Sequence, residues 1–232
     1  MSSVKTNNFI DPASFDSSKV TYSEVKSFGT HSKNAFVIYN NDSNLGLKLP
    51  KMRMPFGVST YEEEGQNPKH VVDVSFDTDN TDPKVKKFYE AIEEFDKKLL
   101  SDAKHNSLAW LKKKKVTDSV LETLYSPSIK KHKNKTTGEY TNEYPPKFRG
   151  KLMFRDGKMK CSIFDHNRKK IDGDALGMLS RGAFITGIVK CTGIWFSNGK
   201  FGATWAFEQI KLDKPKQTNV GYSLSDLLED SD

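Results

Sequence analysis

Basic and aromatic side chains concentrate in one short segment, residues 148–165. Asp156-Gly157 in its middle is typical of a two-residue hairpin turn. Because side chains alternate between the two faces of a strand, this turn predicts one apolar and one basic face. The apolar face would hold Phe148, Leu152, Phe154, Met159, Cys161 and Ile163, and the basic face Arg149, Lys151, Met153, Arg155, Lys158, Lys160 and Phe164. Cations beside an aromatic ring are suited to bind phosphates and bases.

The predicted basic face lacks carboxylates. Like charges directly opposite each other on paired strands destabilise a sheet. We therefore expect the phosphates of a nucleic acid to supply the missing negative charge. The alternative is a positive face that is only solvated.

A second hairpin is predicted over residues 182–212, with Asn198-Gly199 as its turn. In a regular register, one face collects Phe196, Phe201, Trp205, Phe207 and Lys190, and the other Ile185, Val189, Cys191, Trp195, Ile210 and Leu212, with Glu208. Both faces are rich in large apolar groups, so the pattern alone leaves open which of them is core. We expect Phe164, Trp205 and Phe207 to stack on bases, an interaction worth about 1–3 kcal/mol per base.

Further cations lie outside the two hairpins, namely Lys51, Arg53, Lys112, Lys113, Lys131 and Lys133. Residues 105–170 contain 17 Lys and Arg against 6 Asp and Glu, an excess of 11, whereas the whole chain has a net charge of +7. Such a concentration of charge is the electrostatic footprint of a nucleic-acid-binding protein. We expect the partner to be single-stranded, and DNA in particular, because the bases of a duplex are not available for stacking.

Several elements must position these residues. Short strand-like segments separated by Gly, Asn and Pro occur at 34–39, 45–49, 56–61 and 70–77. A helix is expected from Pro83, because Asp82 is able to cap it and apolar residues recur every three or four positions from Val85 to Leu99. A second helical run covers about 107–125.

The chain is therefore expected to be mainly β, with an OB-type five-stranded barrel over 19–212. Helices are inserted at about 83–125, and a basic loop follows at about 126–147. A flexible arm precedes the barrel at 1–18, and a disordered acidic tail follows it at 213–232.

The tail combines acidic and apolar residues, namely Asp226, Leu227, Leu228, Glu229, Asp230 and Asp232. Its charge is opposite to that of the body. It could occupy the cationic groove in the absence of DNA, present its leucines to a partner, or serve only as a solubilising end.

This arrangement of barrel, helical insertion, basic strand pair and acidic C-terminus resembles the single-stranded DNA-binding proteins of large nucleocytoplasmic DNA viruses. These are distantly similar to the corresponding protein of T-seven-type phages. The resemblance covers roughly 19–232 and implies a protein that coats and protects single-stranded DNA during replication and recombination. It also implies homodimers, a tail that contacts replication proteins, and location in the host cytoplasm, at a viral replication site, or in the nucleus. The phage-type tail ends in an aromatic residue, whereas this chain ends in Asp232.

Residues able to support catalysis are scattered. Asp172 and Asp174 have the spacing of a nuclease carboxylate pair, but a lone DGD is typical of a turn. The five His residues show no metal-binding spacing. We therefore expect no enzyme activity, no cofactor and no metal.

Cys161 and Cys191 lie in apolar runs, which predicts two reduced core residues. No run approaches the ~18 apolar residues of a membrane span, so we expect no membrane partner. Residues 1–16 lack a basic-then-apolar signal pattern, so we expect an intracellular protein. Two alternatives stay open. An RNA-binding or RNA-chaperone protein would use the same contacts, and a structural protein would use its charge to package DNA.

Overall fold

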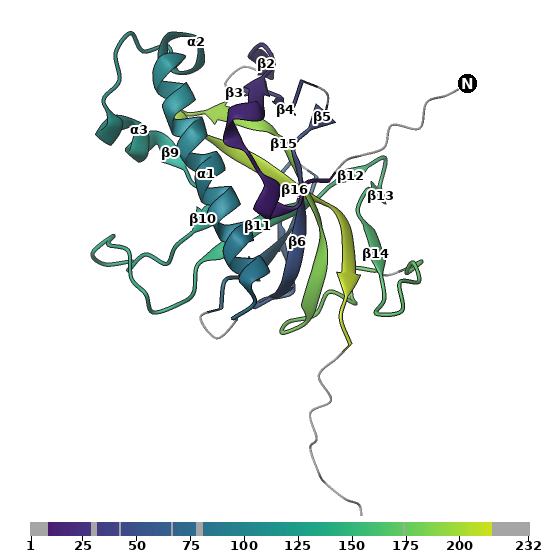
Figure 1. The fold of residues 1–232 in the computed structure, drawn as a ribbon. Coiled ribbons are helices and arrows are strands. Elements are labelled where there is room, and N and C mark those ends of the chain that lie inside the picture. The colour runs from purple at the N-terminus through teal and green to yellow at the C-terminus, as the bar shows by residue number, and fades with distance from the viewer. Residues whose placement is uncertain are drawn as a thin grey trace, which may run out of the picture.

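The computed structural model describes residues 9–28, 32–41, 43–65, 67–77, 81–173 and 175–214. Five strands close into a barrel (Figure 1). In ring order they are β6 (Gly46–Arg53), β8 (Lys69–Ser75), β11 (Lys147–Leu152), β16 (Lys200–Leu212) and β15 (Phe184–Ser197), which pairs back to β6. Only the β11–β16 pairing within this ring is parallel. The expected mainly β fold, a five-stranded OB-type barrel with inserted helices, is confirmed.

Shorter strands extend the barrel. β2 (Lys26–Phe28) and β3 (Ser32–Ala35) continue the sheet beyond β15, and β7 (Val58–Tyr61) pairs with β8. β9 (Tyr125–Ser126) and β14 (Ser162–Phe164) pair with β16, and β10 (Ile129–Lys130) pairs with β11. A separate three-stranded sheet consists of β1 (Val20–Tyr22), β4 (Val37–Tyr39) and β5 (Ser43–Asn44).

The segment 9–18 packs against the barrel, which corrects the flexible arm expected over 1–18. Ile10 N–H donates to the Gly46 carbonyl at 2.9 Å, and the ring of Phe15 stacks on that of Tyr39. The segment contains η1 (Pro12–Ser14) and continues into η2 (Ser17–Lys19), two 3₁₀ turns capped by Asp11 and Asp16. Two apolar anchors, Ile10 and Phe15, hold this otherwise polar segment in place. Residues 1–8 lie outside the described part.

The expected insertion at 83–125 contains three helices. α1 (Pro83–His105) begins as predicted, with the Asp82 side chain accepting from Lys84 N–H at 2.9 Å and Pro83 in its first turn. Its predicted apolar stripe is buried against the barrel. The second helical run is interrupted: α2 (Ser107–Leu111) and α3 (Asp118–Leu124) flank an exposed turn with Lys112–Lys115. Among the described residues no helix is long and apolar enough to cross a membrane.

The first predicted hairpin exists only at its tip. β12 (Phe154–Arg155) and β13 (Lys158–Met159) form the expected ribbon, with Arg155 opposite Lys158. Beyond it the two arms separate: β11 pairs with β8, and β14 pairs with β16. The two arms therefore do not form the continuous hairpin that the turn predicts, because barrel closure gives each arm a different partner.

The second hairpin keeps its predicted register near its turn and at its open end, and departs from it only between Thr192 and Glu208. Phe196 lies opposite Phe201 and Ile194 opposite Ala203, as expected. Farther along, the extra residue Thr192 in β15 shifts the register by one, so Cys191 faces Trp205 and Val189 faces Phe207. The extra residue Glu208 in β16 then restores the predicted register, and Ile185 faces Leu212. An extra residue in one strand reverses the alternation that follows it. Side chains from both predicted faces consequently point into the same core.

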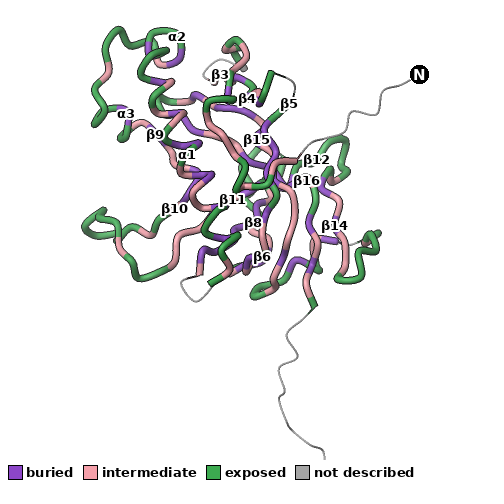
Figure 2. Tube along the Cα trace, in the orientation of Figure 1, coloured by how far each residue is buried: buried purple, intermediate pink, exposed green. Residues whose placement is uncertain are grey.

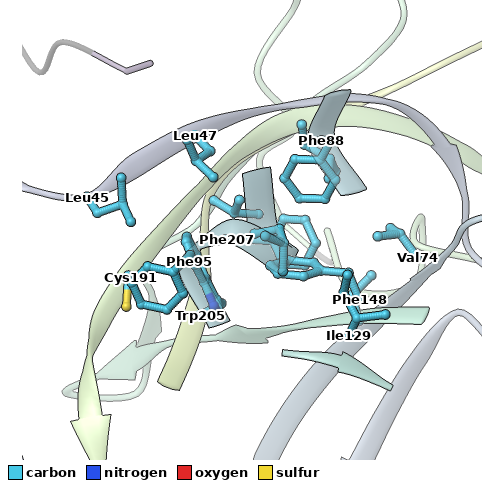
Figure 3. Packing of buried hydrophobic residues seen from close by; sticks show 14 of the residues in the cluster. Leu45, Leu47, Val74, Phe88, Phe95, Ile129, Phe148, Cys191, Trp205 and Phe207 are labelled. Carbon is cyan, nitrogen blue, oxygen red and sulfur yellow. The ribbon is translucent and has the colours of Figure 1, made fainter. Parts of the chain in front are cut away.

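Buried residues recur along α1, β15 and β16 (Figure 2). Aromatic rings from α1, β11 and β16 fill the interior of the barrel (Figure 3). Phe95 and Phe148 both make edge contacts with Trp205, at ring-centroid distances of 5.4 and 5.6 Å. Cys161 and Cys191 are free and buried, and burial raises the pKa of each thiol to about 12. The prediction of two reduced core cysteines is confirmed.

Candidate nucleic-acid interface

The outer surface of β8 and β11 carries alternating basic residues. On β11, Phe148 and Leu152 are buried in the core, so Lys147, Arg149 and Lys151 face outward. On β8, the outer face carries Lys69, Val71, Asp73 and Ser75, since Val72 and Val74 belong to the core. Direct pairing places Arg149 opposite Asp73 and Lys151 opposite Val71.

A cross-strand row connects this surface with neighbouring strands. Ser75 lies opposite both Lys147 on β11 and Arg53 on β6. Arg53 is in turn paired with Phe184 on β15, and Lys147 with Lys130 on β10. Directly paired residues share one face of a sheet. Cations from three distant parts of the sequence therefore lie in one row across five strands.

Two carboxylates hold the arginines of this surface. Arg149 donates to both oxygens of Asp73 at 2.6 and 2.9 Å, and Arg53 donates to both oxygens of Asp77 at 2.7 and 2.9 Å. Burial alone would raise the pKa of Asp73, but the hydrogen bonds and charge of Arg149, with the charge of Lys147, lower it below its ordinary value. The same balance, with Arg53 as the main partner, lowers the pKa of Asp77.

The expectation of a basic face without carboxylates is therefore wrong. Arg149 has its cross-strand neighbour on β8, and that strand supplies Asp73. Positive charge still exceeds negative charge here. Arg149, Lys147 and Lys130 lie near the carboxylate of Asp73, and Lys151 lies opposite Val71, whereas Lys69 is paired with Glu63 at 2.9 Å.

Aromatic rings lie directly beside the cations. The Lys147 Nζ is 4.6 Å from the centre of the Phe56 ring, and the Arg149 guanidinium carbon is 5.8 Å from that of Tyr61. Phe56 is 55% exposed and Tyr61 45%, so each ring retains surface for a further contact. We call this surface the basic–aromatic face; it comprises Lys51, Arg53, Phe56, Tyr61, Lys69, Lys147, Arg149, Lys151 and Phe184.

A cleft of about 390 Å³ borders the basic–aromatic face at Lys69 and Lys151. The rings of His70 and Phe154 lie 4.9 Å apart in its lining, and Phe154 is 38% exposed. Thr60 Oγ1 lies 2.9 Å from His70 Nδ1 and fixes the imidazole orientation. Two cations and an accessible ring at one opening match the chemistry of a nucleotide, with its phosphate and its base.

Some interface residues were not predicted from the sequence. Lys147 continues the alternation of Arg149 and Lys151 by one position, and this pattern was available to find it. Phe56, Tyr61 and Phe184 gave no local signal, because they reach the cations only through nonlocal strand pairing.

Other predicted residues lie elsewhere. Lys112 and Lys113 are in the turn after α2, and Lys131 and Lys133 are in the loop after β10. Arg155, Lys158 and Lys160 are exposed on or beside the β12–β13 ribbon, whereas Phe164 and Lys190 are half-buried on β14 and β15. Lys51 pairs with Asp213, and its Nζ also lies 5.3 Å from the centre of the Phe184 ring. The tail residues Asp226, Leu227, Leu228, Glu229, Asp230 and Asp232 lie outside the described part.

Trp205 and Phe207 are not available for stacking, which corrects the prediction. Each is only 2% exposed, and both belong to the core. Phe207 lies over Gly150, where an added Cβ would come within 2.5 Å of the ring. Both rings continue the alternation of the fully buried Phe201, because β16 has no extra residue between Phe201 and Phe207.

The described residues contain no cluster of three or more His, Cys, Asp or Glu able to hold a metal ion. Asp172 is exposed, and Asp174 lies outside the described part.

Comparisons with known proteins give a family and an architecture. Residues 69–223 match the model of a "Family of unknown function (DUF5871)", whereas no curated protein matches the chain. The fold is similar to that of the single-stranded DNA-binding protein from bacteriophage Enc34 in complex with single-stranded DNA, with a TM-score of 0.45, 12% identity, and coverage of 84% of this chain and 96% of the other. It is also similar to gp2.5, a single-stranded DNA-binding protein encoded by bacteriophage T7, with a TM-score of 0.45, 13% identity, and coverage of 82% and 98%.

Proposed function

We propose that this chain, which belongs to the family of unknown function DUF5871, binds single-stranded DNA on its basic–aromatic face. The observation that supports the proposal most directly is the pairing of cations with exposed rings, Lys147 with Phe56 and Arg149 with Tyr61. Such pairs offer a phosphate contact and a base contact within one nucleotide. The proposal is of binding alone, without chemistry on the strand.

Lysines and arginines have different roles in this proposal. Two of the guanidinium nitrogens of Arg149 are engaged by Asp73, so Arg149 orders the surface and adds charge. Within the described residues Lys151 forms no ion pair, and Lys147 stands 3.4 Å from an Asp73 oxygen already bonded to Arg149. Lys147 and Lys151 are therefore the proposed phosphate contacts.

The rings account for the preference for a single strand. Phe56 and Tyr61 each have a cation over the ring and remain about half exposed, and only an unpaired base presents its own face for stacking. The cleft at His70 and Phe154 would hold a further base at the end of the strand's path.

The wider role follows from the binding. We propose that the protein coats and protects single-stranded DNA during replication and recombination, and that it forms homodimers. The acidic tail would compete with DNA and contact replication proteins. A viral origin, with location in the host cytoplasm or nucleus, belongs to the same proposal.

The test is a titration of fluorescently labelled oligo-dT, followed by anisotropy at several salt concentrations. Tryptophan fluorescence is a poor reporter of this face, because Trp110 and Trp205 are buried and the half-buried Trp195 on β15 is not one of its residues. Lys147→Gln with Lys151→Gln should lower the slope of log affinity against log salt by about 1.4, since each phosphate contact on a single strand contributes about 0.7.

The matched control removes Lys86 and Lys97, exposed cations on the outer surface of α1. This variant should keep the wild-type slope. Equal affinity for duplex and single strand at about 0.15 M salt, or equal losses in the two double variants, would overturn the proposal. Tighter binding of oligo-U than of oligo-dT would instead support the RNA-binding alternative, and binding that never saturates would support packaging by charge.

A further inference from the structure

A second basic cavity lies at the far end of the β15–β16 hairpin. It has a volume of about 380 Å³ and shares no residue with the basic–aromatic face. Its lining comes from the hairpin turn at 197–200, from β2 and β3, and from the chain just after α2. Figure 1 shows α2, β2 and β3 gathered at one end of the molecule.

Three lysines and no acidic residue line this cavity. Lys33, Lys112 and Lys200 come from three different segments, and within the described part of the chain none of them forms an ion pair. Arg53 and Arg149, by contrast, are each held by a carboxylate. Cations that converge without a counter-charge repel one another, and a bound anion relieves this repulsion.

The floor of the cavity is aromatic. Lys33 is directly opposite Phe196, so its side chain leaves the sheet on the face that leads into the core. The rings of Phe196 and Trp110 pack 5.5 Å apart beneath it. Hydroxyl groups complete the wall: Ser32 Oγ and Ser197 Oγ lie 3.4 Å apart. Charges above an apolar floor act more strongly on a ligand than charges surrounded by water.

Lys112 adopts an unusual backbone conformation at this site. Its φ of 56° is left-handed, and its N–H donates to the Leu108 carbonyl at 3.2 Å where α2 ends. Glycine is the relaxed residue for such a helix end. A lysine here strains the backbone and at the same time brings a third cation to the cavity.

We propose that this cavity is a phosphate-binding pocket, in which Lys33, Lys112 and Lys200 hold a phosphate group over the Trp110–Phe196 floor. The phosphate belongs either to a free nucleotide or to a nucleotide of a bound strand. The pocket stands on its own residues and does not require the basic–aromatic face to bind DNA.

The experiment is a titration of isotopically labelled full-length protein with inorganic phosphate, dTMP and oligo-dT, followed by amide and indole NMR shifts. Saturable shifts of the Trp110 indole and of the Ser197–Lys200 amides are expected. Saturation by phosphate or dTMP identifies a free phosphate compound as sufficient, whereas saturation by oligo-dT alone assigns the site to the path of the strand. Absence of saturable shifts with all three ligands overturns the proposal.

Variants separate binding from folding. Lys112→Gly relaxes the backbone, so the melting temperature should stay the same or rise while affinity for the responding ligand falls roughly tenfold, as expected for loss of one charge-assisted hydrogen bond. Lys33→Gln should reduce affinity similarly, whereas Lys114→Gln, an exposed neighbour outside the cavity, should not.

Unchanged shifts in a Lys33→Gln, Lys112→Gly, Lys200→Gln triple variant would refute the pocket. Lys147→Gln with Lys151→Gln should leave the free-phosphate or dTMP response intact, which distinguishes the pocket from the basic–aromatic face.

Discussion

Arg149 on β11 and Asp73 on β8 face each other across the sheet, with Nε donating to Oδ1 at 2.6 Å and Nη2 to Oδ2 at 2.9 Å. Asp73 is only 5% exposed, and Lys147 approaches its second oxygen to 3.4 Å. One covered carboxylate thus orders two cations on the proposed DNA-binding surface without cancelling their combined charge.

Asp73→Asn should separate stability from binding. The substitution keeps the shape but removes the counter-charge, and because Arg149 is 39% exposed, solvent limits the expected loss to about 1–2 kcal/mol of unfolding free energy. Affinity for oligo-dT should be retained or increase, because Arg149 is released. Urea unfolding and anisotropy measure the two effects, and a parallel loss of both would contradict the proposed role.

The same residue predicts an acid dependence. The pKa of Asp73 in the folded protein is lowered below its ordinary value of 3.8. Its contribution to stability is therefore present above pH 3.8 and is lost as the pH falls through the lowered pKa. Unfolding free energy measured between neutral and strongly acidic pH should fall less steeply in Asp73→Asn than in the wild type. An identical dependence of the unfolding free energy on pH in the two proteins would contradict this prediction.

Phe56→Ala and Tyr61→Ala should weaken binding of oligo-dT, since stacking on one ring is worth about 1–3 kcal/mol. Stability should change little, because the two side chains are 55% and 45% exposed. Tyr61→Phe is the matched control that keeps the ring and should bind normally. Anisotropy and thermal melting distinguish the outcomes, and wild-type affinity in both alanine variants would remove the rings from the site.

Trp205 should affect folding and not binding. Trp205→Ala opens a cavity beside Phe95 and Phe148, and truncation of such a buried ring costs about 3–5 kcal/mol. The milder Trp205→Phe should remain folded and bind oligo-dT with wild-type affinity. A folded Trp205→Phe protein with clearly weakened binding would show that the ring reaches the DNA after all.

Asp96 on α1 should prove structural. It accepts hydrogen bonds from Tyr125 Oη at 2.6 Å and from Ser128 N–H at 2.8 Å, and Ser128 in turn accepts from the indole of Trp205. Asp96→Ala leaves these buried donors without a partner and should cost about 2–4 kcal/mol. Glu93→Ala, on the exposed side of the same helix, is the control and should be nearly neutral in chemical denaturation.

The contribution of Asp96 to the unfolding free energy depends on pH with the opposite sign to that of Asp73. Burial raises the pKa of Asp96 above 3.8, against the hydrogen bonds of Tyr125 and Ser128. A raised pKa gives a contribution that is full below pH 3.8 and declines as the pH rises through the folded value. The stability difference between wild type and Asp96→Ala should therefore shrink on going from acid toward neutral pH, and a difference that grows would contradict the assignment.

Local patterns determined much of this protein from its sequence. The start of α1 at Pro83 and the turns at Asp156-Gly157 and Asn198-Gly199 depend on neighbouring residues only, and each occurs where it was predicted. The outward direction of Arg149 and Lys151 follows from alternation along a single strand.

Tertiary structure decided which strands meet and which rings are free. Barrel closure paired β11 with β8 and so placed Asp73, Phe56 and Tyr61 beside the predicted cations, although all three are far away in sequence. The fold also made the face of β16 that carries Trp205 and Phe207 part of the core, and the extra residues Thr192 and Glu208 brought Cys191 and Ile210 onto the same inner side. Alternation is a property of one strand, whereas pairing and bulges depend on how the whole barrel closes around its core. The sequence by itself thus determined the basic chemistry of the surface, and only the fold determined which aromatic rings accompany it.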